Sequence, residues 1–141
     1  MKLNIDHVVN KLKVIVNIGD GIYNVDLGDS GEGKTLLFKM IQSYCIDNNM
    51  EVLIVDYKSR KYARGMIDEI DNESDIVMCL DNADLYMDKE LNLRLKKFKN
   101  AIILVSLKDN SKMPYSKQGY VMYSGNTIRC GVLHNENSND I

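Results

Sequence analysis

The sequence predicts a layered α/β domain with a parallel central sheet, flanked by an N-terminal hairpin and a C-terminal hairpin. In the middle of the chain, short apolar runs alternate with amphipathic helical stretches, which is typical of parallel strands joined by crossover helices. Near both ends, β-rich stretches surround glycine-containing turns. The 141 residues, 45% of them apolar, suffice for one core but not for two. We expect a single domain over residues 1–134 and a disordered polar tail over residues 135–141.

The first two predicted strands form the opening hairpin. Residues 12–18 and 22–27 are both β-rich in composition. Between them, Gly19, Asp20 and Gly21 have the chemistry of a tight turn. The sequence therefore predicts that these two strands pair with each other.

A helix, a strand and a second helix are predicted next. Apolar residues repeat at helical spacing over residues 36–45, and the asparagines at 48–49 provide a stop. The apolar run 51–56 is too short for a surface helix, so we expect a buried parallel strand. Ser59 is the predicted N-cap of the second helix. The apolar face of that helix comprises Tyr62, Met66, Ile67 and Ile70.

The same alternation then repeats. Residues 75–81 have the pattern of a second buried strand, Asp88 is the predicted cap of a third helix, and residues 101–107 have the pattern of a third buried strand. The side chains that the third helix is expected to bury are Leu91, Leu95 and Phe98. Residues 120–133 alternate around a turn at 124–126, which predicts a closing hairpin.

Composition and charge limit the class of protein. Eighteen basic and twenty acidic residues give a net charge of −2, so no overall field draws the chain onto nucleic acid or anionic lipid. Cys45, Cys79 and Cys130 lie mostly in apolar runs without CxxC spacing, a pattern of reduced, buried thiols rather than of a disulfide framework or a zinc site. No apolar stretch approaches the ~20 residues that cross a bilayer. We expect a cytoplasmic protein without a membrane span.

Two clusters of basic residues lie at predicted helix ends. The larger cluster complements the negative C-terminal end of the third helix, which favours a solvated helix end over a nucleic-acid patch. The second cluster lies at the start of the second helix and is small. The clusters consist of Arg94, Lys96, Lys97 and Lys99, and of Lys58, Arg60, Lys61 and Arg64. Nucleic acid is therefore a less favoured partner.

A phosphate-binding motif lies between the second predicted strand and the first helix. Residues 28–35 match G-x-x-x-x-G-K-[ST] without a mismatch, in the strand and helix context that the motif requires. Its glycines let backbone N–H groups converge on a phosphate at the positive end of a helix. Lys34 adds a charge between the β- and γ-phosphates, and the Thr35 hydroxyl is a ligand for Mg²⁺. The predicted nucleotide-binding residues are Gly28, Asp29, Ser30, Gly31, Glu32, Gly33, Lys34 and Thr35.

The motif predicts a P-loop domain of α/β/α layers that binds a nucleoside triphosphate, with ATP and Mg²⁺ as the expected cofactors. Such a site also needs a carboxylate at the tip of a neighbouring strand to hold the metal through its water shell. Asp81, at the end of the second buried strand, is the predicted metal-binding carboxylate. Asp56 ends the preceding strand in the same way but comes one strand too early, so we rank it second.

Several segments together resemble ABC-type ATPases, the class that includes transporter motors and the structural-maintenance-of-chromosomes proteins. Residues 28–41 (GDSGEGKTLLFKMI) resemble that family's P-loop and first helix. Residues 80–84 (LDNAD) resemble its Walker B segment, and residues 85–88 (LYMD) resemble its D-loop. Residues 102–107 stand where the family has its switch-histidine strand, and residues 120–131 (YVMYSGNTIRCG) resemble its closing hairpin. The resemblance implies an ATPase domain.

Three departures from this family concern its catalytic and assembly features. Asn82 stands in place of the general-base glutamate, and its amide cannot accept a proton from water. Leu107 replaces the switch histidine, which leaves Ser106 as the polar group near the γ-phosphate. The stretch between the two motifs is too short for the family's helical subdomain, and no LSGGQ-like signature occurs. Asp84, one turn beyond Asn82, is the candidate replacement base.

These residues leave two functions open. The first is a slow or partner-activated ATPase in which Asp84 and Ser106 take part in catalysis. The second is a non-hydrolysing nucleotide-binding switch that acts through a protein or DNA partner; a homo-oligomer is also open. A small-molecule kinase is less favoured because the chain has little room for an arginine-bearing lid. A GTPase is less favoured because no N-K-x-D motif occurs and no DxxG switch follows the third strand.

Overall fold

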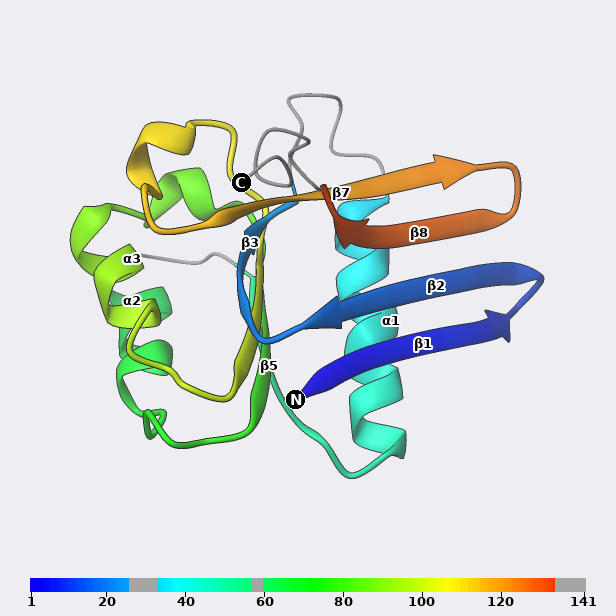
Figure 1. Ribbon diagram of the computed structural model, residues 1–141, viewed down its shortest axis with the longest axis horizontal. Helices are drawn as coiled ribbons and strands as arrows, with labels where there is room; N and C mark the ends of the chain where they lie inside the picture. The colour runs from blue at the N-terminus through cyan, green and yellow to red at the C-terminus, as the bar shows by residue number, and fades with distance from the viewer. Residues whose placement is uncertain (26–32, 57–59, 134–141) are drawn as a thin grey trace, which may run out of the picture.

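The computed structural model describes residues 1–25, 33–56 and 60–133, which form one curled sheet and three α-helices (Figure 1). The strands are β1 (Lys2–Val9), β2 (Leu12–Gly19), β3 (Gly21–Asn24), β4 (Glu51–Val55), β5 (Ile76–Leu80), β6 (Ala101–Val105), β7 (Lys117–Ser124) and β8 (Thr127–Val132). The helices are α1 (Lys34–Asp47), α2 (Arg60–Asp68) and α3 (Lys89–Leu95), with 3₁₀ turns η1 (Ala83–Leu85) and η2 (Asn110–Lys112). The predicted α/β class is confirmed.

The sheet has a parallel core and an antiparallel hairpin towards each end of the chain. Its strand order is β1-β2-β8-β7-β3-β6-β5-β4. The strands β4, β5, β6 and β3 pair in parallel, as does β7 with β3. β1 pairs antiparallel with β2, and β7 with β8, and the two hairpins join through the parallel pair β2 and β8. The closing hairpin is as predicted, with its turn at Gly125 and Asn126.

The N-terminal hairpin differs from the prediction. β1 pairs with β2 along its whole length, and the turn between them consists of Asn10 and Lys11, with φ of 51° and 68°. Two consecutive positive φ angles are the pattern of a type I′ hairpin turn. At residues 19–21 the chain does not form a hairpin but crosses to the centre of the sheet, where β3 pairs with β6 and β7. The predicted pairing of residues 12–18 with 22–27 is therefore wrong; residues 26 and 27 lie outside the described residues.

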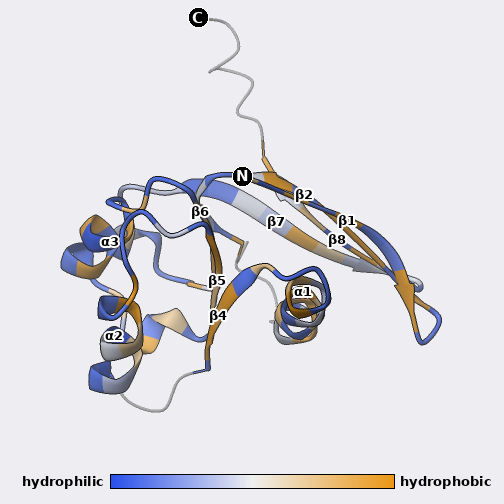
Figure 2. Ribbon diagram, turned by 90° about the horizontal axis from the view of Figure 1, so that it is seen from below, coloured by the Kyte–Doolittle hydropathy of each residue, from blue (hydrophilic) through white to orange (hydrophobic). Residues whose placement is uncertain are grey.

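The sheet curls around α1 (Figure 2). The helix lies between the parallel strands β4 to β6 and the hairpin strands, whereas α2 and α3 cover the other face of the parallel strands. Ile41 of α1 packs in an apolar core that draws on both halves of the sheet, with Val16 from β2 and Leu104 from β6 among its members. Burial of apolar area is worth about 25 cal/mol per Å², so wrapping the hairpins over α1 stabilises both.

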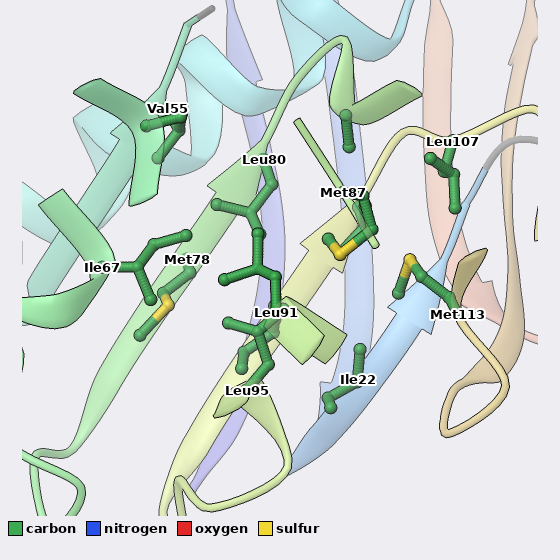
Figure 3. Packing of buried hydrophobic residues seen from close by; sticks show 14 of the residues in the cluster. Ile22, Val55, Ile67, Met78, Leu80, Met87, Leu91, Leu95, Leu107 and Met113 are labelled. Atoms are coloured by element: carbon green, nitrogen blue, oxygen red, sulfur yellow. The ribbon is translucent and has the colours of Figure 1, made fainter. Parts of the chain in front are cut away.

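The core on the other face joins α2 and α3 to the parallel strands (Figure 3). Ile67 of α2 and Leu91 and Leu95 of α3 pack in the same cluster as Met78 of β5. The predicted third helix is confirmed. Asp88 is its N-cap, because its carboxylate accepts a hydrogen bond of 2.8 Å from the Leu91 N–H.

Two predictions about burial are wrong in part. Residues 51–55 do form a parallel strand, but β4 is the edge strand of the sheet and only Val55 is fully buried. An edge strand lacks a neighbour on one side, so its side chains stay partly exposed. In α2, Ala63 and Ile67 are buried, whereas Tyr62 is exposed. Tyr62 therefore does not belong to the apolar face of the helix.

The remaining predictions concern the three cysteines, the N-cap of the second helix, the C-terminal tail and the lack of a membrane span. Cys45, Cys79 and Cys130 are buried, as their apolar surroundings predict. The predicted cap Ser59 and the predicted tail over 135–141 lie outside the described residues. In the described ranges, the helices are too short or too polar to cross a membrane.

Candidate functional site

The candidate site lies at the start of α1. Gly33 is the N-cap of the helix in the left-handed conformation, with φ of 88°, and its carbonyl accepts a hydrogen bond of 2.8 Å from the Leu37 N–H. The first N–H groups of a helix lack partners within it and give this end a partial positive charge. Lys34 is only 5% exposed and lines a cavity here. The rest of the motif lies outside the described residues, so the phosphate cradle stays a prediction: Gly28, Asp29, Ser30, Gly31 and Glu32.

The two predicted metal-binding residues meet at this cavity. The Thr35 hydroxyl donates a hydrogen bond of 2.7 Å to the Asp81 carboxylate. Asp81 is 7% exposed, and its other carboxylate oxygen accepts a bond of 3.0 Å from the Asn82 N–H. The Tyr86 hydroxyl donates to the Asp81 carbonyl at 2.9 Å. Burial, together with the nearby carboxylates of Asp81 and Asp56, raises the pKa of Tyr86 above its usual range, so this hydroxyl stays a donor.

The neighbours of β3 in the sheet are β7 on one side and β6 on the other, and β5 lies one place beyond β6. The expectation that Asp81 ends a strand adjacent to β3 is therefore wrong, although Asp81 still reaches Thr35. Ser106 directly follows β6, is 8% exposed and lines the cavity. Its N–H donates to the Leu80 carbonyl and its carbonyl accepts from the Ala83 N–H, both at 3.0 Å. Its hydroxyl has no hydrogen-bond partner among the described residues, which leaves it available to a ligand.

A cavity of about 130 Å³ joins these residues at the carboxyl ends of the parallel strands, where α/β sheets bind ligands. It is lined by Lys34, Thr35, Asp81, Asn82, Asp84, Ser106 and Lys108. The structure thus brings together every described residue of the predicted site except Gly33. Lys108 is an addition that could not be identified from sequence, because nothing in its local pattern distinguishes it from a surface lysine.

Asp84 holds the loop that follows β6. Its carboxylate accepts hydrogen bonds from the N–H groups of Lys108 at 2.9 Å and of Asp109 at 3.1 Å. The Nζ of Lys112 donates to the Asp84 carbonyl at 2.9 Å. Asp84 therefore fixes this loop in place. Its role as general base stays a prediction.

A second set of hydrogen bonds ties the same loop to the end of β3. The buried Asn24 side chain donates to the Leu107 carbonyl at 2.8 Å and accepts from the Leu107 N–H at 3.3 Å. It also donates to the side-chain oxygen of Asn110. Leu107 is fully buried in the core shown in Figure 3, together with Met113. The position at which the resemblance places a histidine therefore belongs to the core and does not line the cavity.

Asn82 and Asp56 differ in their relation to the cavity. Asn82 lines it and is exposed, with a left-handed backbone of φ 51° and ψ 41°. Asparagine adopts this conformation more readily than most residues. Asp56 is exposed and does not line the cavity, whereas Asp81 lines it.

The two basic clusters make contacts within the fold. Arg60 and Arg64 both pair with the Asp88 carboxylate at the start of α3. The Arg94 guanidinium lies 4.5 Å from the centroid of the Phe98 ring. These contacts support the interpretation of the clusters as parts of the folded surface rather than as a nucleic-acid patch.

The cavity combines two kinds of chemistry. The Lys34 ammonium, the Ser106 hydroxyl and the helix N–H groups favour an anion. The Thr35 hydroxyl and the Asp81 carboxylate are oxygen ligands of the kind that Mg²⁺ takes together with water and phosphate oxygens. The residues present therefore fit a phosphate group with its magnesium ion. Comparisons of the chain with protein-family models, with curated proteins and with solved structures found no match.

Proposed function

We propose that this protein binds a nucleoside triphosphate, ATP, together with Mg²⁺ at the start of α1. The proposal is carried by the hydrogen bond of 2.7 Å between the Thr35 hydroxyl and the Asp81 carboxylate. These residues belong to separate segments of the chain, and each is the metal ligand that its own segment predicts. Their contact supports a ligand-binding site over the alternative interpretation, a glycine-rich turn that binds no ligand.

The cavity residues divide into phosphate ligands and metal ligands. Lys34 and the N–H groups of α1 are the proposed ligands of the β- and γ-phosphates. Ser106 and Lys108, from the end of β6, add a hydroxyl and a cation for the γ-phosphate. Thr35 would hold Mg²⁺ directly and Asp81 through its water shell. A bound Mg²⁺ ion would supply positive charge that offsets the negative charge of the phosphates.

Hydrolysis at this site is proposed to be slow or dependent on a partner. Asn82 stands where ABC-type ATPases, which the sequence resembles, have a general-base glutamate, and an amide cannot take a proton from water. Asp84 lines the cavity, but its carboxylate already accepts hydrogen bonds from Lys108 and Asp109. A partner protein or a second copy of the chain that shifts this loop would free the carboxylate to act as the base.

A non-hydrolysing switch is the second candidate function. The observation that favours it is the loop after β6, which is tied to Asp84 on one side and to Asn24 on the other. A γ-phosphate in contact with Lys108 would change the hydrogen bonds at both ends of this loop. Occupancy of the site would then change the loop without cleavage of a bond, and a protein or DNA partner would respond to that change.

Calorimetric titration of the purified chain with ATP and Mg²⁺ tests the proposal. We expect saturable binding, and we expect Lys34→Ala to weaken it by about tenfold or more, because a hydrogen bond to a charged group contributes about 1.5–3 kcal/mol. Lys39→Ala removes an exposed cation from the same helix and is the matched control. No saturable binding at millimolar nucleotide, or equal affinity in Lys34→Ala, would show that the proposal is wrong.

Phosphate release then separates the two candidate functions. Turnover by the wild-type chain that disappears in Lys34→Ala indicates an ATPase. Saturable binding without turnover, both alone and with candidate partners, indicates the switch. Equal release by the two proteins would indicate a contaminating enzyme and remove the support for hydrolysis.

A further inference from the structure

The free edge of the sheet at β4 is apolar. β4 is the last of the parallel strands and lies between α1 on one face and α2 on the other (Figure 2). After Glu51 it consists of four aliphatic residues, of which only Val55 is fully buried. Natural sheets blunt a free edge with charged side chains or proline, because unpaired backbone groups there can bind another strand. The other edge strand, β1, carries Lys2 and Asp6 and borders a groove with α1.

The backbone of β4 directs two residues outward from this edge. The Val55 carbonyl faces β5, because it accepts a hydrogen bond of 3.0 Å from the Asp81 N–H. Alternate residues of a strand bond to the same neighbour, so Leu53 also faces β5. Val52 and Ile54 therefore direct their N–H and carbonyl groups away from the sheet. Among the described residues, no strand pairs with this side of β4.

A second copy of β4 fits this edge in antiparallel orientation. With a two-fold axis through Leu53, Val52 pairs with Ile54 of the partner subunit, and the reverse pair forms on the other side of the axis. The backbone groups of both residues point outward, so these are the pairs that exchange hydrogen bonds. The half-buried side chains of Val52, Leu53 and Ile54 would then pack against their counterparts across the axis.

The exposed face of α2 is complementary to itself. A hollow of about 550 Å³ on this face is lined by Lys61, Tyr62, Gly65, Met66 and Glu69. Lys61 and Glu69 carry opposite charges and lie equally far from Gly65 along the chain. When two copies of the helix pack antiparallel about Gly65, Lys61 lies opposite Glu69 of the partner subunit at both ends of the contact. Tyr62, which is 51% exposed, lies beside Met66 of the partner subunit.

Gly65 leaves room for the two helices to approach each other. Glycine is among the least favourable residues in a helix interior. A Cβ atom added to Gly65 would meet nothing within 4 Å in the described part of the chain, so packing within one chain does not require glycine here. At the centre of a helix pair, a residue without a side chain permits close contact of the backbones.

The strand pairing and the helix packing share one axis. α2 begins where β4 ends and runs back along the sheet towards the start of β5. The five residues of β4 span about 16 Å and the nine of α2 about 13 Å, so the middle of the helix lies level with the middle of the strand. An axis through Leu53, perpendicular to the sheet, therefore passes at the level of Gly65. One rotation forms both contacts.

We propose that two copies of this chain form a symmetric dimer, in which β4 pairs with β4 of the partner subunit and α2 packs on its counterpart. The axis makes the parallel strands of the two copies antiparallel to each other. The carboxyl ends of these strands, where the cavity of the candidate site lies, then point in opposite directions. The dimer forms without nucleotide and does not depend on the proposed function.

Sedimentation velocity of the purified chain over a series of concentrations, without nucleotide, tests the dimer. We expect a species of twice the chain mass of 16.1 kDa, which Lys34→Ala leaves unchanged. Lys61→Glu places like charges opposite each other at two points and should raise the dissociation constant about tenfold or more. Adding Glu69→Lys to that variant restores opposite charges and should restore the dimer. Lys97→Glu makes the same charge change at an exposed residue beyond α3 and is the matched control.

Amide hydrogen exchange tests the strand pairing separately. In the dimer the N–H groups of Val52 and Ile54 donate across the axis, so they should exchange slowly. In Lys61→Glu, at a concentration where that variant is monomeric, the same amides should exchange quickly. Gly65→Gln is a second variant: its Cβ atom has room in the single chain, so the chain should fold, but the added side chain should weaken the dimer.

Several results would overturn the inference. A chain that stays monomeric at millimolar concentration would exclude the dimer. A dimer that Lys61→Glu does not weaken, or one in which the Val52 and Ile54 amides exchange quickly, would use another surface. A dimer that forms only with ATP would also contradict it, because the axis keeps the two nucleotide sites apart. Failure of the chain to bind nucleotide would remove the proposed function and leave this dimer standing.

Discussion

Thr35 Oγ1 and Asp81 Oδ2 lie 2.7 Å apart in a hydrogen bond that joins the first turn of α1 to the end of β5. Because the acceptor is a carboxylate, a bond of this kind contributes about 1.5–3 kcal/mol to stability. The same two oxygens are the proposed ligands of Mg²⁺, one direct and one through water. The pair therefore stabilises the contact between the two segments in the free protein, and under the proposed function it would also hold the metal when nucleotide is bound.

Thr35→Val removes the hydroxyl while keeping the shape of the side chain. We expect it to weaken ATP binding in the presence of Mg²⁺ by about tenfold or more. It should also reduce the difference between the ATP affinity measured with Mg²⁺ and the ATP affinity measured with EDTA. Thr35→Ser keeps the hydroxyl and serves as the control. If ATP binding by Thr35→Val depended on Mg²⁺ as strongly as binding by the wild type, the assignment of Thr35 as a metal ligand would be incorrect.

Asp84→Ala tests the role of Asp84 in holding the loop after β6. The substitution leaves the N–H groups of Lys108 and Asp109 without their acceptor. We expect the free energy of unfolding, measured by urea denaturation, to fall by about 1–3 kcal/mol. Asp84→Asn keeps one carbonyl oxygen and should lose less. A variant Asp84→Asn with wild-type stability but no phosphate release would instead show that Asp84 acts as the base.

Asp88 is a pH-sensitive contact between α2 and α3. Burial raises the pKa of its carboxyl, but the hydrogen bond from the Leu91 N–H and the guanidinium groups of Arg64 and Arg60 outweigh this, so the pKa is lowered overall. A lowered pKa means that the stabilisation is present above the unfolded-state value of about 3.9. It is lost as the pH falls through the lower folded-state value.

Asp88→Ala should therefore reduce the free energy of unfolding by about 1–2 kcal/mol near neutral pH, the usual cost of losing an N-cap. The difference from the wild type should shrink as the pH falls below about 4, because Asp88 is protonated first in the unfolded chain and then, at its lower pKa, in the folded protein. Urea denaturation across this pH range provides the measurement. Asp88→Asn keeps a capping oxygen without the charge, so it should lose less stability than Asp88→Ala. A difference that stays constant with pH would mean that the charge of Asp88 contributes nothing.

The site residues that could be predicted from sequence are those with a local signal. Lys34 and Thr35 belong to a contiguous motif, and Asp81 ends an apolar run of strand length. Helical and strand periodicity place these residues at element ends, and crossovers return parallel strands to the same edge of a sheet. That is enough to predict that Thr35 and Asp81 approach each other, although β6 lies between their strands.

The residues that could not be predicted depend on long-range contacts. Asn24 bonds to Leu107 across 83 positions, and Tyr123 meets Gly33 only because β7 extends beyond β3. Neither contact leaves a periodic pattern in the sequence. The first hairpin was mispredicted for a related reason: Asn10 and Lys11 form its turn without the glycine that usually marks one. Gly19, which ends β2, and Gly21, which begins β3, lie instead where the chain crosses to the centre of the sheet.

Amide chemical shifts of the isotope-labelled chain, followed by NMR as ATP and Mg²⁺ are added, test the central claim most directly, because they locate the bound nucleotide. We predict saturable changes at the start of α1 and after β6, while α2 amides such as that of Ala63 stay unchanged. The amides expected to shift are those of Gly33, Lys34, Thr35, Ser106 and Lys108. Changes confined to another surface, such as the groove between β1 and α1, or no change at millimolar nucleotide, would contradict a triphosphate site at this helix.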